Sequence, residues 1–494
     1  MSRKLPIFYS ALLLTGVNLL LRLVGTSFQV YLSGRIGAEG IGLLQLVMSV
    51  GSMALVAGMA GIRTATMYLT AEEHGRKTPG NVIWVLSGSI KYSILCSVAV
   101  GAAIYFFAPF LAEKWIGNIH TVDSIRLFGM FLPINCLTGV MVGYFTGANR
   151  IGTLAAVEVV EQIFSMACTL LLLHFWAGNN AEKACQAVVI GSGMSACMTL
   201  CCLTLLRLLE RSRQAPSIPI AKRLTRTAIP LALADDLRTG ITTVENLMVP
   251  KRLALYSGVI SPLAEFGTVC GMVFPILMFP VALLFGLTEL LVPELARCRA
   301  AGSETRIRYL VKKCLRVTLL YGVLCAGILF LTAPALCQAL YNNTNAGKYL
   351  KWFAPLAILL YCDCVTDAMI KGLGQQTASV RYNILTNTMD VILLYALLPR
   401  CGITGYFFSF LVTHLLNFIL SIRRLLLISD ERISISIPVV TIIASCLAVW
   451  IAAFTPTPLS QSLSYVAILV CLLFLLKILN RDDIIWLKCL MRKK

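Results

Sequence analysis

Apolar segments long enough to cross a lipid bilayer recur along this chain between residues 8 and 479. One crossing needs about 20 mainly apolar residues, and a helix satisfies its backbone hydrogen bonds internally where no water is present. Of the 494 residues, 58% are hydrophobic and only 13% are charged, and the mean hydropathy is +0.82. This composition excludes a soluble globular protein with an ordinary surface. The sequence therefore predicts an all-α, polytopic membrane protein with about 14 transmembrane helices.

Lysine and arginine are distributed unevenly over the predicted loops. The chain has 42 of them against 23 Asp and Glu, which gives a net charge of +19. They gather in every second loop and at both ends of the chain. The positive-inside rule explains this bias, so we expect both termini in the cytoplasm and no nucleic-acid partner. Lys251 and Arg252 lie in a loop on the opposite side, which makes this pair a candidate for function.

The sequence carries none of the common signatures of hydrolases, metalloproteases, nucleotide-binding enzymes or cysteine metal sites. It contains no GxSxG, HExxH or Walker sequence, and its short loops leave no room for a soluble catalytic domain. The 18 cysteines are scattered without CxxC spacing, and neither His174 nor His414 has a second ligand nearby. We therefore expect a transporter without disulfides, metal or cofactor. Since no nucleotide site is present, uphill transport would draw on the membrane potential or on a coupling ion whose identity is unknown.

A weak internal repeat has an offset of about 225 residues. The segment from Ala38 to Gly42 recurs from Ala264 to Gly267, and the segment 146–150 recurs as 371–375. Each repeat holds six spans, so both copies enter the membrane in the same direction. This pattern predicts two pseudo-symmetric six-helix lobes, residues 1–215 and 216–430, with substrate between them. Residues 431–494 would form two accessory helices and a basic C-terminal tail.

Charged and polar residues inside the predicted spans indicate where a substrate would bind. Each such charge costs about 2.5 to 3.5 kcal/mol at a lipid-facing helix centre, so these side chains must face water or partners. In the span at about 224–249, acidic and basic residues share one helical face. The candidates for substrate binding are Asn18, Arg22, Gln29, Arg63, Arg238, Lys251 and Arg252. The candidates for coupling or gating are Asp235, Glu245, Glu158 and Glu161.

Arginines around a cavity suit an anion, since guanidinium groups match phosphate oxygens in bidentate geometry. Other interpretations stay open. Glu158 and Glu161 could pair with arginine only to lock helices together. The row of Asp363, Asp367 and Lys371, at spacings of four, could simply neutralise itself.

Two other classes of function also stay open. Acidic groups mixed with the arginines are compatible with an ion-coupled multidrug or cation extruder. Asp235 and Asp236 begin like the aspartate-rich motif of membrane prenyltransferases, although a third acid and a second copy of the motif are missing.

Several motifs together resemble one family of flippases. They are Arg35-Ile-Gly-Ala-Glu-Gly-Ile-Gly-Leu-Leu-Gln45, Ala60-Gly-Ile-Arg-Thr-Ala65, Val157-Glu-Val-Val-Glu-Gln162, Ala228-Ile-Pro230, Val249-Pro-Lys-Arg-Leu253, Gly271-Met-Val-Phe-Pro-Ile276 and Leu291-Val-Pro-Glu294. These segments look like the stage V sporulation protein B group of polysaccharide and lipid-linked oligosaccharide flippases. That group belongs to the multidrug/oligosaccharidyl-lipid/polysaccharide (MOP) exporter superfamily.

The resemblance implies a monomer in the bacterial cell membrane that works by alternating access around a central cationic cavity. Its substrate would be an undecaprenyl-diphosphate-linked sugar, such as the peptidoglycan precursor lipid II or a spore-cortex precursor, and membrane lipids would surround it. The resemblance also implies that Arg22, Arg63 and Arg238 hold the diphosphate.

Overall fold

The computed structural model describes residues 7–75, 81–178, 180–209, 221–431, 436–476 and 478, and within these ranges the chain is helical without any strand. Its α-helices are α1 (Ile7–Met59), α2 (Ile62–Gly75), α3 (Val82–Phe110), α4 (Val122–Gly147), α5 (Ile151–Leu172), α6 (Ala181–Leu208), α7 (Ala221–Leu253), α8 (Pro262–Thr268), α9 (Phe274–Met278), α10 (Val281–Ala300), α11 (Glu304–Tyr341), α12 (Thr344–Phe353), α13 (Leu356–Gly372), α14 (Gln376–Cys401), α15 (Ile403–Ser429), α16 (Ser436–Ala452) and α17 (Pro458–Leu475). Short π-helical turns, η2 (Leu111–Ile116), η4 (Leu173–Ala177) and η5 (Val269–Val273), follow α3, α5 and α8, and one 3-10 turn, η3 (Ile119–Thr121), precedes α4.

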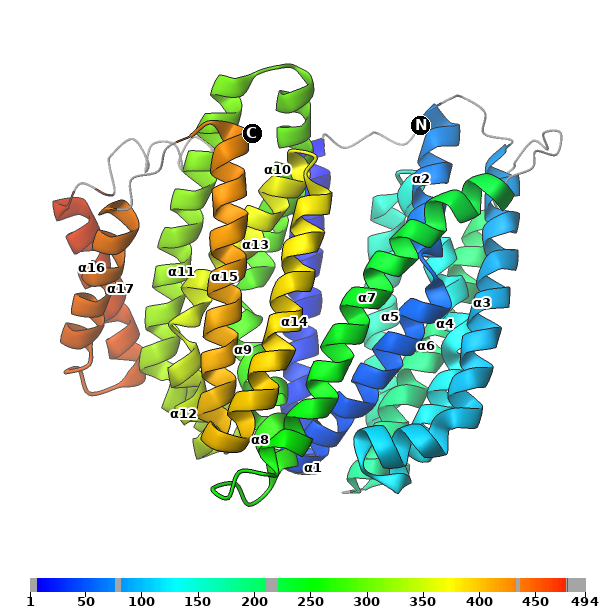
Figure 1. The fold of residues 1–494 in the computed structure, drawn as a ribbon, viewed down its shortest axis with the longest axis horizontal. Helices are drawn as coiled ribbons and strands as arrows, with labels where there is room; N and C mark the ends of the chain where they lie inside the picture. The colour runs from blue at the N-terminus through cyan, green and yellow to red at the C-terminus, as the bar shows by residue number, and fades with distance from the viewer. Residues whose placement is uncertain are drawn as a thin grey trace. The chain divides into compact units, whose positions relative to one another are not determined.

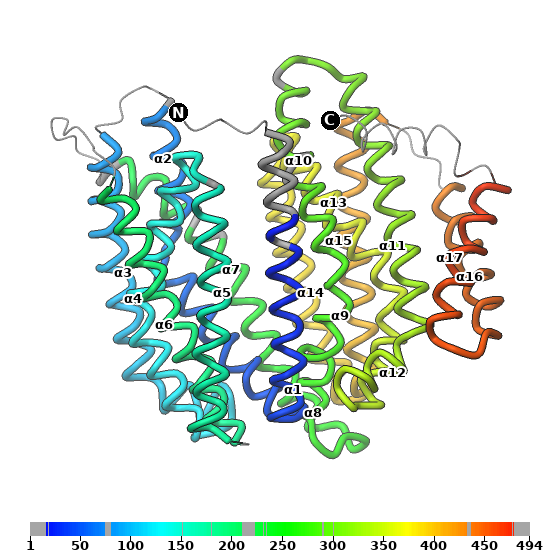
Figure 2. Tube along the Cα trace, turned by 180° about the vertical axis from the view of Figure 1, so that it is seen from behind, coloured from blue at the N-terminus to red at the C-terminus, as the bar shows by residue number. Residues whose placement is uncertain are grey.

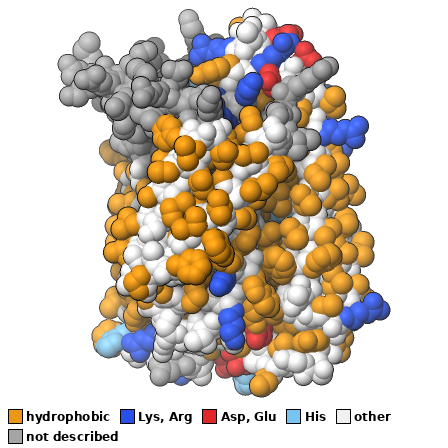
Figure 3. All heavy atoms as spheres, turned by 90° about the vertical axis from the view of Figure 1, so that its left-hand side faces the viewer, with side chains coloured by type: hydrophobic (Ala, Val, Ile, Leu, Met, Phe, Trp, Pro, Cys, Tyr) orange, Lys and Arg blue, Asp and Glu red, His pale blue; other side chains and the backbone are white. Residues whose placement is uncertain are grey.

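The predicted all-α membrane fold is confirmed, whereas the count of 14 spans is not. Among the described residues nine helices are long and apolar enough to cross a membrane, or up to eleven if each of two bent pairs is one span. α1 consists of two helical segments separated by a non-helical break at Gly37, whose φ is 68°, and the count of nine takes both segments and α2 together as one span. Charges lower the hydropathy of α7, and α16 has only 17 residues. These features explain why fewer helices qualify. On the face drawn in Figure 3, hydrophobic side chains cover most of the middle.

The chain divides into two compact units. Unit 1 comprises residues 1–271 and 387–406, and unit 2 comprises residues 272–386 and 407–494. In unit 1, α7 runs alongside the second half of α1 (Figure 1). A buried apolar cluster that includes Ile62, Leu69 and Leu224 joins α2 to the start of α7. In unit 2, α16 and α17 pack on α11, as both views of the chain show (Figures 1 and 2).

Tyr465 is the centre of this packing of α16 and α17. Its ring is fully buried beside Gly327 of α11, where a larger residue would not fit. Its hydroxyl donates to the carbonyl oxygen of Val323 at 2.8 Å and lies 2.9 Å from Ser445 Oγ. A buried phenol needs such partners, so these bonds fix how the two helices sit on α11.

The internal repeat is visible in close helix contacts. A side-chain carbon placed on Gly147 of α4 would lie 2.5 Å from the carbonyl oxygen of Met67 in α2. About 225 residues later, a side-chain carbon on Gly372 of α13 would lie 2.9 Å from the carbonyl oxygen of Val292 in α10. From the first contact to the second, the residue numbers of both partners increase by the same repeat offset. The two contacts lie in different units, so each unit contains the same type of helix crossing.

A second glycine contact relates the two repeats to each other inside unit 1. A side-chain carbon on Gly42 of α1 would lie 2.3 Å from the carbonyl oxygen of Leu263 in α8. A side-chain carbon on Gly267 of α8 would lie 2.0 Å from the carbonyl oxygen of Ala38 in α1. The repeat offset relates Gly42 to Gly267 and Ala38 to Leu263. Each of these contacts is therefore the repeat equivalent of the other. This crossing therefore has a local twofold relation, and only glycine permits so close an approach of two backbones.

Candidate functional site

A pocket between α1 and α7 is the candidate site. Its volume is about 320 Å³, and it is lined by Ser52 and Val56 of α1 and by Asp235, Arg238, Thr239, Thr242, Thr243 and Asn246 of α7. The lining residues of α7 recur at helical spacing, so one face of the helix supplies a carboxylate, a guanidinium, three hydroxyls and an amide. The predicted polar face of this helix therefore lines a cavity.

Two hydrogen bonds fix the position of α7 along α1. Thr243, which is buried, donates from Oγ1 to the carbonyl oxygen of Ser49 at 3.2 Å. Asn246 donates from Nδ2 to Ser49 Oγ at 3.0 Å. Since Arg238 lies a little more than one turn before Thr243, these bonds also hold its backbone next to the pocket.

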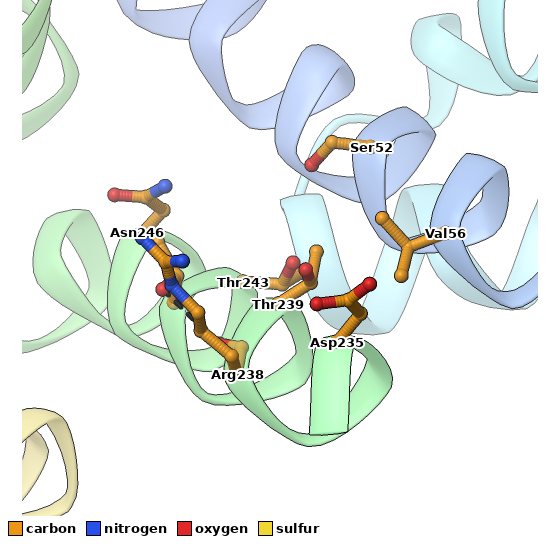
Figure 4. Close-up of a pocket in the computed structure, with 8 residues that line it drawn as sticks. Ser52, Val56, Asp235, Arg238, Thr239, Thr243 and Asn246 are labelled. Carbon is orange, nitrogen blue, oxygen red and sulfur yellow. Dashed lines mark hydrogen bonds between the residues drawn. The ribbon is translucent and has the colours of Figure 1, made fainter. Parts of the chain in front are cut away.

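Arg238 is available to a ligand. In Figure 4 its side chain extends along α7 in the direction of Asn246, while the carboxylate of Asp235 points toward Val56 of α1. Both side chains are exposed, and neither forms a salt bridge with another described residue. An exposed guanidinium that lines a pocket without a salt-bridge partner is a favourable place for an anionic group.

Arg63 and two glutamates form a separate group in unit 1. The side chain of Arg63, near the start of α2, is exposed, and its charge acts on Glu158 and Glu161 of α5. The backbone of Arg63 packs closely on α4, since a side-chain carbon on Gly143 would lie 2.4 Å from its carbonyl oxygen. None of these three side chains lines the pocket of Arg238. Opposite charges from two helices are thus brought within electrostatic range of one another.

The predicted residues of the first span lie along α1. Gln29 donates from Nε2 to the carbonyl oxygen of Gly271 in η5 at 3.2 Å, which connects α1 to the turn after α8. Arg22 is half-buried and does not line the pocket. The side chain of Asn18 is outside the described part of the structure.

Lys251 and Arg252 connect the end of α7 to its neighbours. The Lys251 ammonium donates to the carbonyl oxygen of Lys114 in η2. The guanidinium of Arg252 lies over the ring of Tyr395 in α14, 3.2 Å from the ring centroid. Such a cation–π contact stabilises a helix end without any substrate.

Sequence reasoning missed Asp390. Glu245 of α7 and Asp390 of α14 are joined by a side-chain hydrogen bond inside unit 1. Two carboxyl groups in such contact need a shared proton or a bound cation, because two bare carboxylates repel one another. The only sign of Asp390 in the sequence is a single acid in an otherwise uncharged stretch from residue 382 to residue 399.

The fold is similar to that of solved membrane transporters. An inward-facing multidrug transporter of the MATE family of that superfamily matches with a TM-score of 0.68 at 13% identity, over 85% of this chain and all of that one. A lipid II flippase MurJ in an inward closed conformation matches with a TM-score of 0.70 at 12% identity, over 96% of this chain and all of that one. The expected membrane fold is therefore shared with solved transporters.

The sequence relatives agree with the resemblance stated above and confirm it. Residues 8–235 match the family described as polysaccharide biosynthesis protein. The chain is 24% identical to stage V sporulation protein B of Bacillus subtilis strain 168 over 410 residues, which are 80% of this chain and 78% of that protein. It is also 24% identical to the lipid II flippase MurJ of the same strain, over 73% of this chain and 71% of the flippase. These relatives support a transporter and not an enzyme.

Proposed function

We propose that this protein is a flippase that moves an undecaprenyl-diphosphate-linked sugar, lipid II or a related envelope or spore-cortex precursor, across the membrane by alternating access. The observation that carries the proposal is the Arg238 guanidinium, which lines the pocket between α1 and α7 without a salt-bridge partner among the described residues. The similarity to stage V sporulation protein B and to lipid II flippases supports the choice of substrate.

The chemistry of the pocket suits a diphosphate attached to a sugar. Arg238 supplies a planar pair of donors that matches two phosphate oxygens. Thr239 and Thr242 supply hydroxyl donors on the same face of α7, and the acceptor oxygens of Asp235 are suited to sugar hydroxyls. Arg22 and Arg63 are proposed as further contacts to the diphosphate in other conformations of the transport cycle, with Asn18, Gln29, Lys251 and Arg252 near its path.

Coupling is assigned to acidic residues of unit 1. The pair of Glu245 and Asp390 is proposed to take up and release the coupling ion, since two adjacent carboxyl groups change their net charge when a proton or cation leaves. The group of Arg63, Glu158 and Glu161 is proposed to gate, because its attraction depends on the distance between α2 and α5. Asp235 would contribute to gating from inside the pocket.

The test is flipping of a fluorescent lipid II probe in liposomes that contain the purified protein. Wild type should expose the probe on the far leaflet faster than empty vesicles do, and Arg238→Ala should abolish this activity. Asp236→Asn, one position after Asp235 and outside the pocket lining, is the matched control and should leave flipping intact. Equal rates for wild-type and empty vesicles would disprove the assigned substrate.

A cation extruder is the second candidate, and the presence of Asp235 in the pocket favours it. An extruder would lower the accumulation of a cationic dye in cells or vesicles, and Asp235→Asn would remove that effect. The flippase proposal expects no dye transport. A membrane transferase would instead lose activity when magnesium is chelated, and flipping should be insensitive to chelation.

The orientation and the assembly state also belong to this proposal. Both termini should face the cytoplasm, because the basic loops follow the positive-inside rule. A C-terminal tag should therefore be cleaved by protease only after the cells are opened. The purified protein in detergent should behave as a monomer in light scattering.

A further inference from the structure

Two acidic side chains of α13, Asp363 and Asp367, lie in different environments within unit 2. Asp367 is neutralised, since its Oδ2 lies 2.6 Å from Lys371 Nζ and its Oδ1 accepts a hydrogen bond from Ser379 Oγ. Asp363, one turn earlier on the same helix, has no such cation. Its Oδ2 accepts a hydrogen bond of 2.8 Å from Asn417 Nδ2 of α15. The two carboxyl groups therefore need different explanations.

Two oxygen atoms at this contact have no hydrogen-bond donor. Within the described residues, both Asp363 Oδ1 and Asn417 Oδ1 are buried and lack any hydrogen bond. Asn417 is only 6% exposed, so water does not readily supply a donor. A buried acceptor without a partner costs about 1 to 3 kcal/mol, and here both members of one hydrogen-bonded pair carry such an acceptor.

One proton would satisfy both oxygens. An ionised carboxylate only accepts hydrogen bonds, whereas a protonated one gains an O–H donor. A carboxylic acid and a primary amide form a ring of two hydrogen bonds: the amide N–H donates to the carbonyl oxygen of the acid, and the acid O–H donates to the amide oxygen. The bond from Asn417 to Asp363 Oδ2 is the first of these, and a proton on Asp363 Oδ1 would form the second.

The surrounding charges favour the same conclusion. The charged groups that act on Asp363 are Asp367 and Lys371, and these already neutralise each other. His414, one turn before Asn417 on α15, has its ring against Phe410 with the centroids 4.1 Å apart. No described cation is therefore left to balance an ionised Asp363. The acid form needs no counter-charge.

We propose that Asp363 is a proton-binding group of unit 2 and that Asn417 is the amide partner of its acid form. The proton comes from water and returns to water, so no other reactant is required. Release of the proton leaves Asp363 Oδ1 and Asn417 Oδ1 without a donor. The contact between α13 and α15 is thereby weakened, which makes it depend on protonation. This site is separate from the pair of Glu245 and Asp390, and it stands whether or not the proposed substrate is correct.

Infrared difference spectroscopy of the full-length protein in lipid tests this proposal. A protonated carboxyl has a C=O stretching band that carboxylates lack, and the wild type should lose one such band as the pH rises through the range of about 5 to 9 in which buried carboxyls titrate. Asp363→Asn should remove that band. Asp367→Asn is the matched control, one turn away on the same helix, and should keep it. Asn417→Leu should move the band to higher wavenumber, because the C=O group loses its donor.

Any of three other results would overturn the proposal. A band that persists unchanged in Asp363→Asn shows that another group titrates. A band that sodium removes at constant pH shows a metal-cation site instead of a proton site. An unmoved band in Asn417→Leu disproves the amide partner. Thermal unfolding of each variant in detergent shows whether it is folded, and Asn417→Gln supplies a second variant that retains the amide.

Discussion

Phosphate binding by Arg238 should depend on the shape of its side chain as well as on its charge. If it binds a phosphate through two parallel N–H donors, an ammonium cannot replace it. We expect Arg238→Lys to retain less than about a tenth of the flipping rate, which corresponds to a loss of more than about 1.4 kcal/mol in binding the transition state. Initial rates with the fluorescent lipid II probe provide the measurement. A rate close to wild type would indicate that only the charge matters.

Asp390 leads to a prediction about coupling. Replacing it with Asn leaves one carboxyl where two now share a hydrogen bond, so the site would no longer change its charge with ion binding. In Asp390→Asn, flipping should become independent of an imposed proton or sodium gradient. The measurement compares rates with and without each gradient. Glu113→Gln removes an exposed acid and is the control, and it should keep the gradient dependence of wild type.

The difference between Arg238 and Asp390 shows what the sequence can predict about a site. The polar face of α7 could be predicted because it follows from the spacing of residues within one helix, which the local sequence contains. The partner of Glu245 lies on a different helix far along the chain, and its position follows from packing that no local pattern describes. The resemblance to flippases implied that Arg63 and Arg238 hold one diphosphate. In this structure the charge of Arg63 acts on Glu158 of α5, and Arg238 lines the pocket with α1.

At the scale of helices, Arg223 attaches the start of α7 to α2. Its Nη1 lies 2.9 Å from Glu73 Oε1 and its Nη2 lies 2.8 Å from Glu72 Oε2. Glu73 is buried and also accepts a hydrogen bond from Asn81 at 3.0 Å, whereas Glu72 is exposed. The bond to Glu73 is therefore the one on which stability depends.

Loss of this guanidinium should destabilise the protein. Arg223→Ala removes the charged donor that lies against the buried carboxylate of Glu73, and we expect a cost of about 2 kcal/mol. Glu72→Gln removes the exposed pair with Arg223 and should cost less than about 1 kcal/mol. Thermal unfolding in detergent micelles compares the two variants. Equal melting temperatures for Arg223→Ala and wild type would contradict the assigned role.

The break at Gly37 and the charges of α7 explain why the helices could be predicted as a class but not counted. Hydropathy located the apolar segments correctly, because each must fill the same bilayer thickness. The count is lower partly because the two helical segments of α1, on either side of Gly37, are taken together with α2 as one span. Hydropathy also treated α7 as an ordinary span, although its charged face needs a pocket.

The repeat makes a prediction for the whole molecule. Gly147 and Gly372 occupy equivalent positions, and a side-chain carbon added to each would lie 2.5 and 2.9 Å, respectively, from equivalent carbonyl oxygens. Gly147→Ala and Gly372→Ala should therefore destabilise the protein by similar amounts, about 1 to 3 kcal/mol each, through overpacking. Gly152→Ala on α5 meets open space and should be neutral or slightly stabilising. Melting temperatures in one detergent test this, and a large effect at only one of the two sites would contradict the equivalence.

The crossing of Gly42 and Gly267 has a consequence for how a protein of this kind can arise. Because the contact matches itself under the repeat, nothing in its geometry requires both halves to be encoded in one gene. Two copies of a half-length polypeptide could form it, with Gly42 of each copy against Ala38 of the other. Duplication and fusion of such an ancestor would keep the joint and let each half then change alone.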